Sequence, residues 1–174
     1  YFPTLITIPT HIAVHGTDLG MTQTKAAFLL SAIGAASIIG RLSVGIFLDK
    51  VGGRKSYLFC FVPILLSLLI FIFVTNHTIL FLFVALYGFA HGALFVVVSP
   101  TIAEYFGLRD HASLFGIVVF CGTIGGAIGP ILAGSVFDLT GSYNIAFATL
   151  FILITLSSIV VLTLPETTKK NDFS

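Results

Sequence analysis

Two residues of this 174-residue sequence, Arg41 and His91, combine reactive side chains with apolar surroundings. A guanidinium in a stretch otherwise free of Asp, Glu, Lys and Arg costs a few kcal/mol in a membrane, so it requires a partner. Its planar fork matches a carboxylate, and a histidine titrates near neutral pH. We therefore hypothesise a site for a small organic anion. The alternatives are an arginine that reaches the membrane surface or pairs with a structural acid, and a histidine that is merely hydrogen-bonded.

No motif in the sequence indicates metal binding, a disulfide framework or catalysis. Cys60 and Cys121 stand far apart without a CxxC pair, so we predict neither a metal site nor a disulfide framework. The sequence has no nucleophile elbow, HExxH motif or P-loop, and its five histidines are scattered. We expect no catalytic residues, no metal and no cofactor, and hence a protein that is not an enzyme.

The composition indicates an integral membrane protein. Hydrophobic residues make up 57% of the chain and charged residues 9%, whereas a soluble domain carries roughly 25% charged residues. The net charge of +1 also excludes nucleic-acid binding, which needs clustered Lys and Arg. The longest uncharged run, 56–103, has 48 residues, and two further runs cover 111–137 and 139–165. Continuous apolar runs of this length favour membrane helices over barrel strands.

Polar segments divide these runs into six predicted spans, so the expected fold is an all-α membrane bundle of six helices. We predict a polar turn over 15–25, charged or semi-polar loops over 49–55 and 100–110, and a tight turn over 75–78. The predicted spans are 2–14, 26–48, 57–74, 79–98, 112–137 and 144–164.

The first span covers only about two thirds of a bilayer core, and the sequence opens on Tyr1. We therefore expect a chain cut within its first helix, with a six-helix domain over 1–164 and a polar tail over 165–174. Basic residues are retained on the cytoplasmic side. Six of them fall on one side of the predicted bundle and Lys25 on the other, which predicts a cytoplasmic C-terminus.

Small residues recur inside three spans at helical spacing. Such residues let membrane helices approach closely, and a Gly-Pro pair permits a kink or a sliding contact. The same pattern serves static packing or a bundle that rocks between two states. The residues to which we assign packing or kink roles are Gly88, Gly92, Gly122, Gly126, Gly129 and Pro130.

The segment 45–55, Gly-Ile-Phe-Leu-Asp-Lys-Val-Gly-Gly-Arg-Lys, resembles the loop signature of the major facilitator superfamily, G-x-x-x-D-[RK]-x-G-[RK]-[RK]. Gly53 departs from it, because it stands where the first basic residue belongs. In that family the signature lies on the cytoplasmic side between the second and third helices of each six-helix half. Residues 165–167, Pro-Glu-Thr, are similar to the ending that often follows the last helix.

Further segments resemble the monocarboxylate transporters and the oxalate/formate antiporters of that superfamily, covering nearly the whole chain as helices seven to twelve. The resemblance implies a twelve-helix transporter that moves small organic anions by alternating access. It assigns the carboxylate to Arg41, and Ser37 stands where animal members place an aspartate. The eleventh helix lacks the second basic residue of the oxalate type, which favours a single carboxylate. The segments are 26–34, 40–41, 87–92, 104–108, 128–134 and 138–143.

The signature also predicts a cytoplasmic gate. We expect Asp49 to cap the positive end of the neighbouring eleventh helix, and Arg54 to pair with Glu104. The alternative is a charged loop that serves topology alone. The remaining members of the predicted gate motif are Gly45, Lys50 and Gly52.

The predicted partners are a small organic anion, H⁺ as the coupling ion, a missing N-terminal six-helix half and the lipid bilayer of a plasma or bacterial inner membrane. Three alternatives remain open at this stage. The first is a major facilitator transporter of another solute, by oxalate/formate-type exchange or drug efflux. The second is a six-helix scaffold or channel, and the third is a membrane-embedded enzyme with dispersed catalytic groups.

Overall fold

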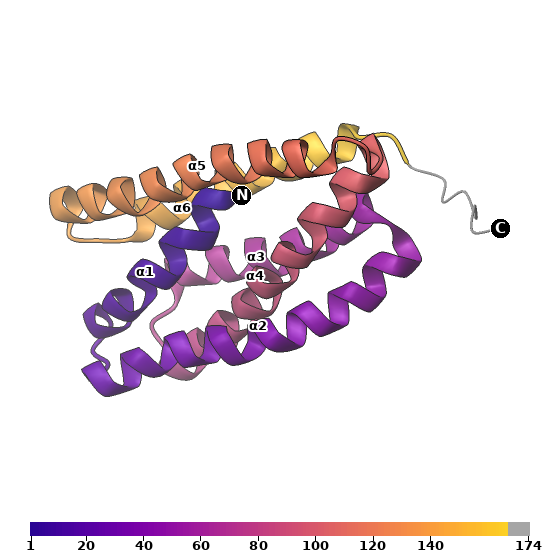
Figure 1. The fold of residues 1–174 in the computed structure, drawn as a ribbon. Helices are drawn as coiled ribbons and strands as arrows, with labels where there is room; N and C mark the ends of the chain where they lie inside the picture. Colours follow the sequence, from indigo (N-terminus) through magenta and orange to yellow (C-terminus); the bar gives the residue numbers. More distant parts are fainter. Residues whose placement is uncertain (167–174) are drawn as a thin grey trace.

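The computed structural model describes residues 1–166, which form six α-helices joined by short connections (Figure 1). Five of the helices, α2 to α6, are long and apolar enough to cross a membrane. The first, α1, has 17 residues and so measures about 25 Å against a hydrocarbon core of about 30 Å. The helices are α1 (Phe2–Asp18), α2 (Gln23–Val51), α3 (Gly53–Phe73), α4 (His77–Phe106), α5 (His111–Thr140) and α6 (Asn144–Thr163).

The bundle is held by a few extensive helix pairs. Helix α2 packs along α4, α4 also packs against α3, α3 packs against α6, and α1 packs against α5 and α2. Figure 1 shows α1 and α4 crossing obliquely between α2 and the α5/α6 edge. Large apolar side chains fill the centre, including the fully buried Phe61, Phe71, Tyr87 and Phe147.

Helix α5 buries little of its surface within this bundle. Its buried residues are Gly122, Gly126 and Ala133, while isoleucines, leucines and phenylalanines along its length are exposed. Exposed apolar area of this extent is incompatible with a water-facing surface. It fits contact with lipid or with another apolar bundle.

The prediction of a loop over 49–55 is wrong, because α2 continues to Val51 and α3 begins at Gly53. The charged residues of this segment extend the helices beyond the apolar run instead of ending them. Gly52 alone joins the two helices, with φ 82° and ψ 171°. Non-glycine residues rarely adopt that conformation, so the sharp turn depends on glycine.

The prediction of a loop over 100–110 is also wrong for most of its length. Helix α4 passes through Pro100 and ends at Phe106, and Gly107 with φ 77° terminates it. The last turn is tied to other parts of the chain, because the Tyr105 hydroxyl donates a hydrogen bond to the Pro165 carbonyl oxygen at 2.7 Å. Tertiary contacts thus extend α4 past the proline.

At the opposite end of the bundle, α1 extends through residues 15–18, which we predicted as part of a polar turn, and only 19–22 connect it to α2. The predicted turn at 75–78 is shorter than expected, because α4 starts at His77. Asn76 caps this helix, since its side-chain oxygen accepts hydrogen bonds from the amides of Thr78 and Ile79.

Candidate functional site

Arg41 lies on α2 with its side chain exposed. The guanidinium carbon stands over the ring of Phe95 on α4, 5.7 Å from its centre. Within residues 1–166 no carboxylate lies at ion-pair distance from Arg41. A structural acid in the described part of the chain therefore does not neutralise this charge, and the N–H groups directed away from the ring are available to an anion.

His91 lies on α4 and shares the same aromatic neighbour. Its ring centre is 5.3 Å from that of Phe95, in an edge-to-face arrangement. The Tyr87 hydroxyl donates to the Thr4 carbonyl oxygen at 2.9 Å and lies 3.2 Å from His91 Nδ1. Because the hydroxyl has a single proton, Nδ1 must donate to Tyr87. Tyr87 thereby fixes the tautomer of a neutral His91 and leaves its Nε2 as an acceptor.

Ser37, one helical turn before Arg41, points into the interface between α2 and α4. Its hydroxyl is buried and donates to the Gly34 carbonyl oxygen of its own helix at 2.8 Å. Close packing surrounds it, since a Cβ added to Gly92 would lie 2.6 Å from Ser37 Cα. A Cβ added to Gly88 would likewise lie 2.7 Å from Ile33 Cα. The two glycines therefore permit the backbone contact between α2 and α4 that holds Arg41 near His91.

Several glycines of α5 face α1. A Cβ on Gly122 would meet the Phe2 ring at 2.5 Å, and one on Gly126 would meet the Ile6 side chain at 2.9 Å. A Cβ on Gly129 would meet the Thr7 hydroxyl of α1 at 2.5 Å, and Pro130 follows Gly129 in the sequence. The absence of side chains at these glycines lets α5 approach α1 closely. The kink role assigned to Gly129 and Pro130 stays a prediction.

Pro130 also takes part in a polar contact that joins three helices. Nε2 of His11, on α1, donates to the Pro130 carbonyl oxygen at 3.0 Å, so Nδ1 of a neutral His11 accepts from the Tyr143 hydroxyl at 3.1 Å. Burial, followed by the charges of Asp18 and Asp138, raises the pKa of Tyr143, which keeps its hydroxyl protonated as a donor. The contact fastens α1 to α5 and to the start of α6.

Glu104 on α4 caps the start of α3. Its Oε2 accepts a hydrogen bond from the Gly53 amide at 2.7 Å, which satisfies one of the free N–H groups at that helix end. Gly53 also allows α3 to approach α4, because an added Cβ would lie 2.8 Å from Thr101 Cβ. The departure of Gly53 from the family signature therefore has a steric reason: a side chain here would collide with Thr101.

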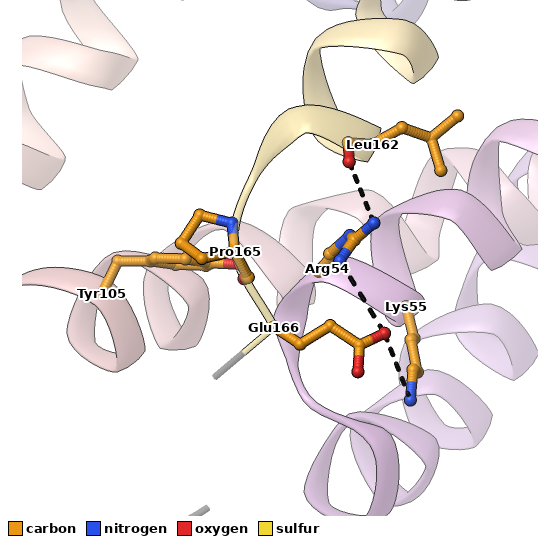
Figure 2. Close-up of polar contacts among 6 residues, drawn as sticks. All are labelled: Arg54, Lys55, Tyr105, Leu162, Pro165 and Glu166. Carbon is orange, nitrogen blue, oxygen red and sulfur yellow. Dashed lines mark hydrogen bonds and ion pairs between the residues drawn. The ribbon is translucent and has the colours of Figure 1, made fainter. Parts of the chain in front are cut away.

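The side chain of Arg54 reaches the end of α6 (Figure 2). It donates to the Leu162 carbonyl oxygen at 2.9 Å and lies 3.7 Å from the Glu166 carboxylate. Lys55 approaches the same carboxylate at 3.8 Å. Arg54 forms an ion pair with Glu166, and Glu104 caps α3. The Arg54–Glu104 pair stays a prediction. Together these contacts tie the ends of α3, α4 and α6 into one polar cluster.

The other members of the predicted gate motif lie on the last turns of α2. Asp49 and Lys50 are exposed, and the side of Gly45 where a Cβ would stand is open. Within residues 1–166 Asp49 forms no hydrogen bond or ion pair with the start of α5, whose N-cap is Asp110. Its gating role stays a prediction.

Sequence reasoning missed Phe95, Tyr87 and Glu166 as parts of these sites. An i, i+4 spacing places Tyr87, His91 and Phe95 on one face of α4, and this signal was available in the sequence. The pairing of Glu166 with Arg54 joins residues over 100 positions apart, and no local pattern predicts it.

Comparison of the chain with known proteins identifies its family. A model of the Major Facilitator Superfamily matches residues 2–173. Human monocarboxylate transporter 7 is 34% identical over 151 residues, which are 84% of this chain and 28% of that protein. Rat monocarboxylate transporter 13 is 32% identical over 158 residues, 90% of this chain and 37% of that protein.

Human monocarboxylate transporter 2 is 28% identical over 157 residues, or 87% of this chain and 32% of its own length. The chain thus spans about a third of the length of the curated relatives it matches. The predictions of an all-helical bundle and of a multi-pass membrane protein are confirmed. The chain belongs to the Major Facilitator Superfamily, and within it the chain is similar to monocarboxylate transporters.

Proposed function

We propose that this protein moves a small organic anion, a monocarboxylate, across a membrane by alternating access. The observation that carries the proposal is the Arg41 guanidinium, which lies over Phe95 and has no carboxylate partner in residues 1–166. A carboxylate that binds Arg41 bidentately would replace the missing counter-charge. The names of the monocarboxylate transporters to which the chain is similar support the same class of substrate.

His91 is the second group of the proposed site. Its Nε2 is left as an acceptor by the Tyr87 contact, so a proton added there would give a second positive charge near the anion. We assign proton coupling to this residue. Ser37 is the third residue of the predicted site. Its hydroxyl proton is already donated to the Gly34 carbonyl oxygen, so Ser37 would contribute to anion binding only through its oxygen as an acceptor or through packing.

The complete transporter contains a second six-helix half in this proposal, and the substrate site lies between the halves. The exposed apolar surface of α5 and the fraction of the relatives' length that the chain spans support it. The positive-inside rule places the α2–α3 junction and the C-terminus in the cytoplasm. Part of the tail predicted over 165–174, including Lys169 and Lys170, lies outside the described residues.

Uptake by the full-length protein in proteoliposomes tests the substrate and the site. Radiolabelled lactate, pyruvate, formate and oxalate are compared for wild type, Arg41→Gln and Arg41→Lys. We expect uptake of a monocarboxylate to be lost in Arg41→Gln and reduced in Arg41→Lys, because lysine keeps the charge but not the fork. Preferential uptake of oxalate would instead favour the exchange type.

Arg109→Gln is the matched control, because it removes an equal charge from the short α4–α5 connection, where the side chain is exposed. It should transport like wild type. Full uptake by Arg41→Gln, with the variant correctly inserted, would overturn the anion site while leaving the family assignment untouched.

A further inference from the structure

Within residues 1–166, Tyr87 is the hydrogen-bond partner of His91, and its hydroxyl proton is already committed to another helix. The hydroxyl donates to the Thr4 carbonyl oxygen of α1 at 2.9 Å and lies 3.2 Å from His91 Nδ1. Tyr87 and Thr4 are both 0% exposed, so water cannot replace either partner. The proton of neutral His91 is therefore held on Nδ1.

The other imidazole nitrogen of His91, Nε2, is an acceptor that a small molecule can reach. It has no hydrogen-bond partner in the described part of the chain, and packing does not seal it as it seals Nε2 of His15. Nδ1 is directed at Tyr87, one turn before His91 on α4, so Nε2 across the ring is directed toward the turn of Phe95. The Phe95 ring carries the Arg41 guanidinium, and Arg41 is the charged group of residues 1–166 that acts on His91.

The site thus presents donors at Arg41 and an acceptor at Nε2 of His91, and a small acid matches both when it carries a donor beside its carboxylate. In a 2-hydroxy acid, the carboxylate accepts from the guanidinium and the adjacent hydroxyl donates to Nε2. In a 2-oxo acid, the adjacent group is a carbonyl oxygen, which cannot donate. Either two acceptors then face each other, or the carbonyl turns away and Nε2 stays unpaired. The lost hydrogen bond lowers affinity by about ten-fold.

We infer that Tyr87 makes the anion site selective for 2-hydroxy monocarboxylates over 2-oxo monocarboxylates, because it holds the proton of neutral His91 on Nδ1. This inference rests on the anion site proposed above and names the class of acid that the site prefers. Tyr87 is a positioning residue, since it acts through His91 and does not touch the acid. The selectivity belongs to neutral His91, because a second proton on Nε2 would turn that atom into a donor.

The test measures equilibrium binding to the full-length protein in lipid nanodiscs at about pH 8, where His91 is neutral. The ligands are 2-hydroxybutyrate, 2-oxobutyrate and butyrate, which share the carbon chain and the carboxylate and differ at the second carbon. We expect the Kd for 2-hydroxybutyrate to be about ten-fold lower than that for 2-oxobutyrate. In Tyr87→Phe, which keeps the side-chain shape, the His91 proton can move to Nε2, so the two Kd values should differ by less than about two-fold.

Tyr105→Phe is the matched control, because it removes a hydroxyl of the same helix that donates to the Pro165 carbonyl oxygen, and it should keep the wild-type ratio. ¹⁵N NMR of histidine-labelled protein, with His91→Gln to assign the signal, reads the tautomer without any change at Tyr87. It should show the His91 proton on Nδ1. Equal affinities for the hydroxy and oxo acids in wild type, a ratio that survives Tyr87→Phe, or a proton on Nε2 would each overturn the inference.

Arg41→Gln separates this inference from the proposed function. It should lose binding of all three acids, as the proposed anion site requires. If Arg41→Gln binds them like wild type, the anion site is wrong. If binding requires Arg41 but wild type does not distinguish the hydroxyl from the oxo group, the anion site stands and the role of Tyr87 is wrong.

Discussion

The guanidinium of Arg41 lies 5.7 Å from the centre of the Phe95 ring, and this contact joins α2 to α4 beside His91. A cation over an aromatic face gains about 0.5–2 kcal/mol, depending on its exposure to water. The Arg41 side chain is otherwise exposed. Phe95 therefore positions the group that we assign to substrate binding.

Phe95→Leu should weaken substrate binding without abolishing transport. Loss of the ring removes the contact that holds the Arg41 side chain, so we expect KM for the monocarboxylate to rise about three- to ten-fold while the maximal rate changes less. Concentration-dependent uptake in proteoliposomes measures both parameters. Phe28→Leu, at an exposed position of α2, is the control and should leave KM unchanged.

His91→Gln should flatten the pH dependence of uptake. If protonated His91 assists anion binding, wild-type uptake rises as the pH is lowered, because the imidazole gains a proton and a positive charge. Glutamine can still donate to Tyr87 but cannot gain a charge. The measurement is the initial uptake rate between pH 5 and pH 8. His77→Gln, at the other end of α4, should keep the wild-type profile, and an unchanged profile in His91→Gln would refute the coupling role.

Gly92→Ala should destabilise the bundle, because the added methyl group would collide with the backbone at Ser37. Overpacking of this kind costs about 1–3 kcal/mol. Gly34→Ala provides the comparison, since no atom lies within 4 Å of the new Cβ, and it should be neutral or stabilising by up to about 1 kcal/mol. Thermal unfolding of the purified variants distinguishes the two, and equal effects would argue against the close α2–α4 contact.

Glu104→Ala should cost more stability than Glu166→Ala. Glu104 caps the Gly53 amide in a half-buried setting, a contact worth about 1–2 kcal/mol. The Glu166 side chain is 66% exposed, and exposed ion pairs contribute roughly 0–1 kcal/mol and are screened by salt. Unfolding at low and high salt checks both statements. A larger loss for Glu166→Ala would reverse this ranking.

Asp49→Asn should impair transport while leaving membrane insertion and thermal stability intact. We expect this because Asp49 has no partner within residues 1–166, so its predicted gating contact would form only in another state or with another part of the protein. Asp138→Asn, an exposed position near the end of α5, serves as the control. If Asp49→Asn takes up substrate at the wild-type rate, the gating role of Asp49 is wrong and the charged segment serves membrane topology alone.

The helices themselves follow directly from the sequence, because uncharged runs of this length have no other way to satisfy their backbone in a membrane. Their ends do not follow in the same way. Charges at Asp49 and Glu104 predict loops, yet both residues lie within helices, since a helix continues into the polar region when its last turn finds contacts there. Pro100 likewise predicts the end of a helix, yet α4 continues past it to Phe106.

The site is predictable only in part. Arg41 is conspicuous because it is a lone charge in an apolar span, whereas Phe95 is one of 18 phenylalanines and gains its role from the crossing of α2 and α4. The capping contact of Glu104 with the Gly53 amide depends on how α3 and α4 meet. Such arrangements are set by long-range packing, which local spacing does not encode.

The single-residue junction at Gly52 has a mechanical consequence. Any change in the angle between α2 and α3 must be absorbed by two backbone dihedrals, and the Glu104 carboxylate stands against that glycine. A tilt of α2, which carries Arg41, is therefore expected to bear on α3 at Gly52 and on α4 through Glu104. In the proposed transport cycle, the position of Arg41 would therefore be coupled to the tilt of α2, α3 and α4.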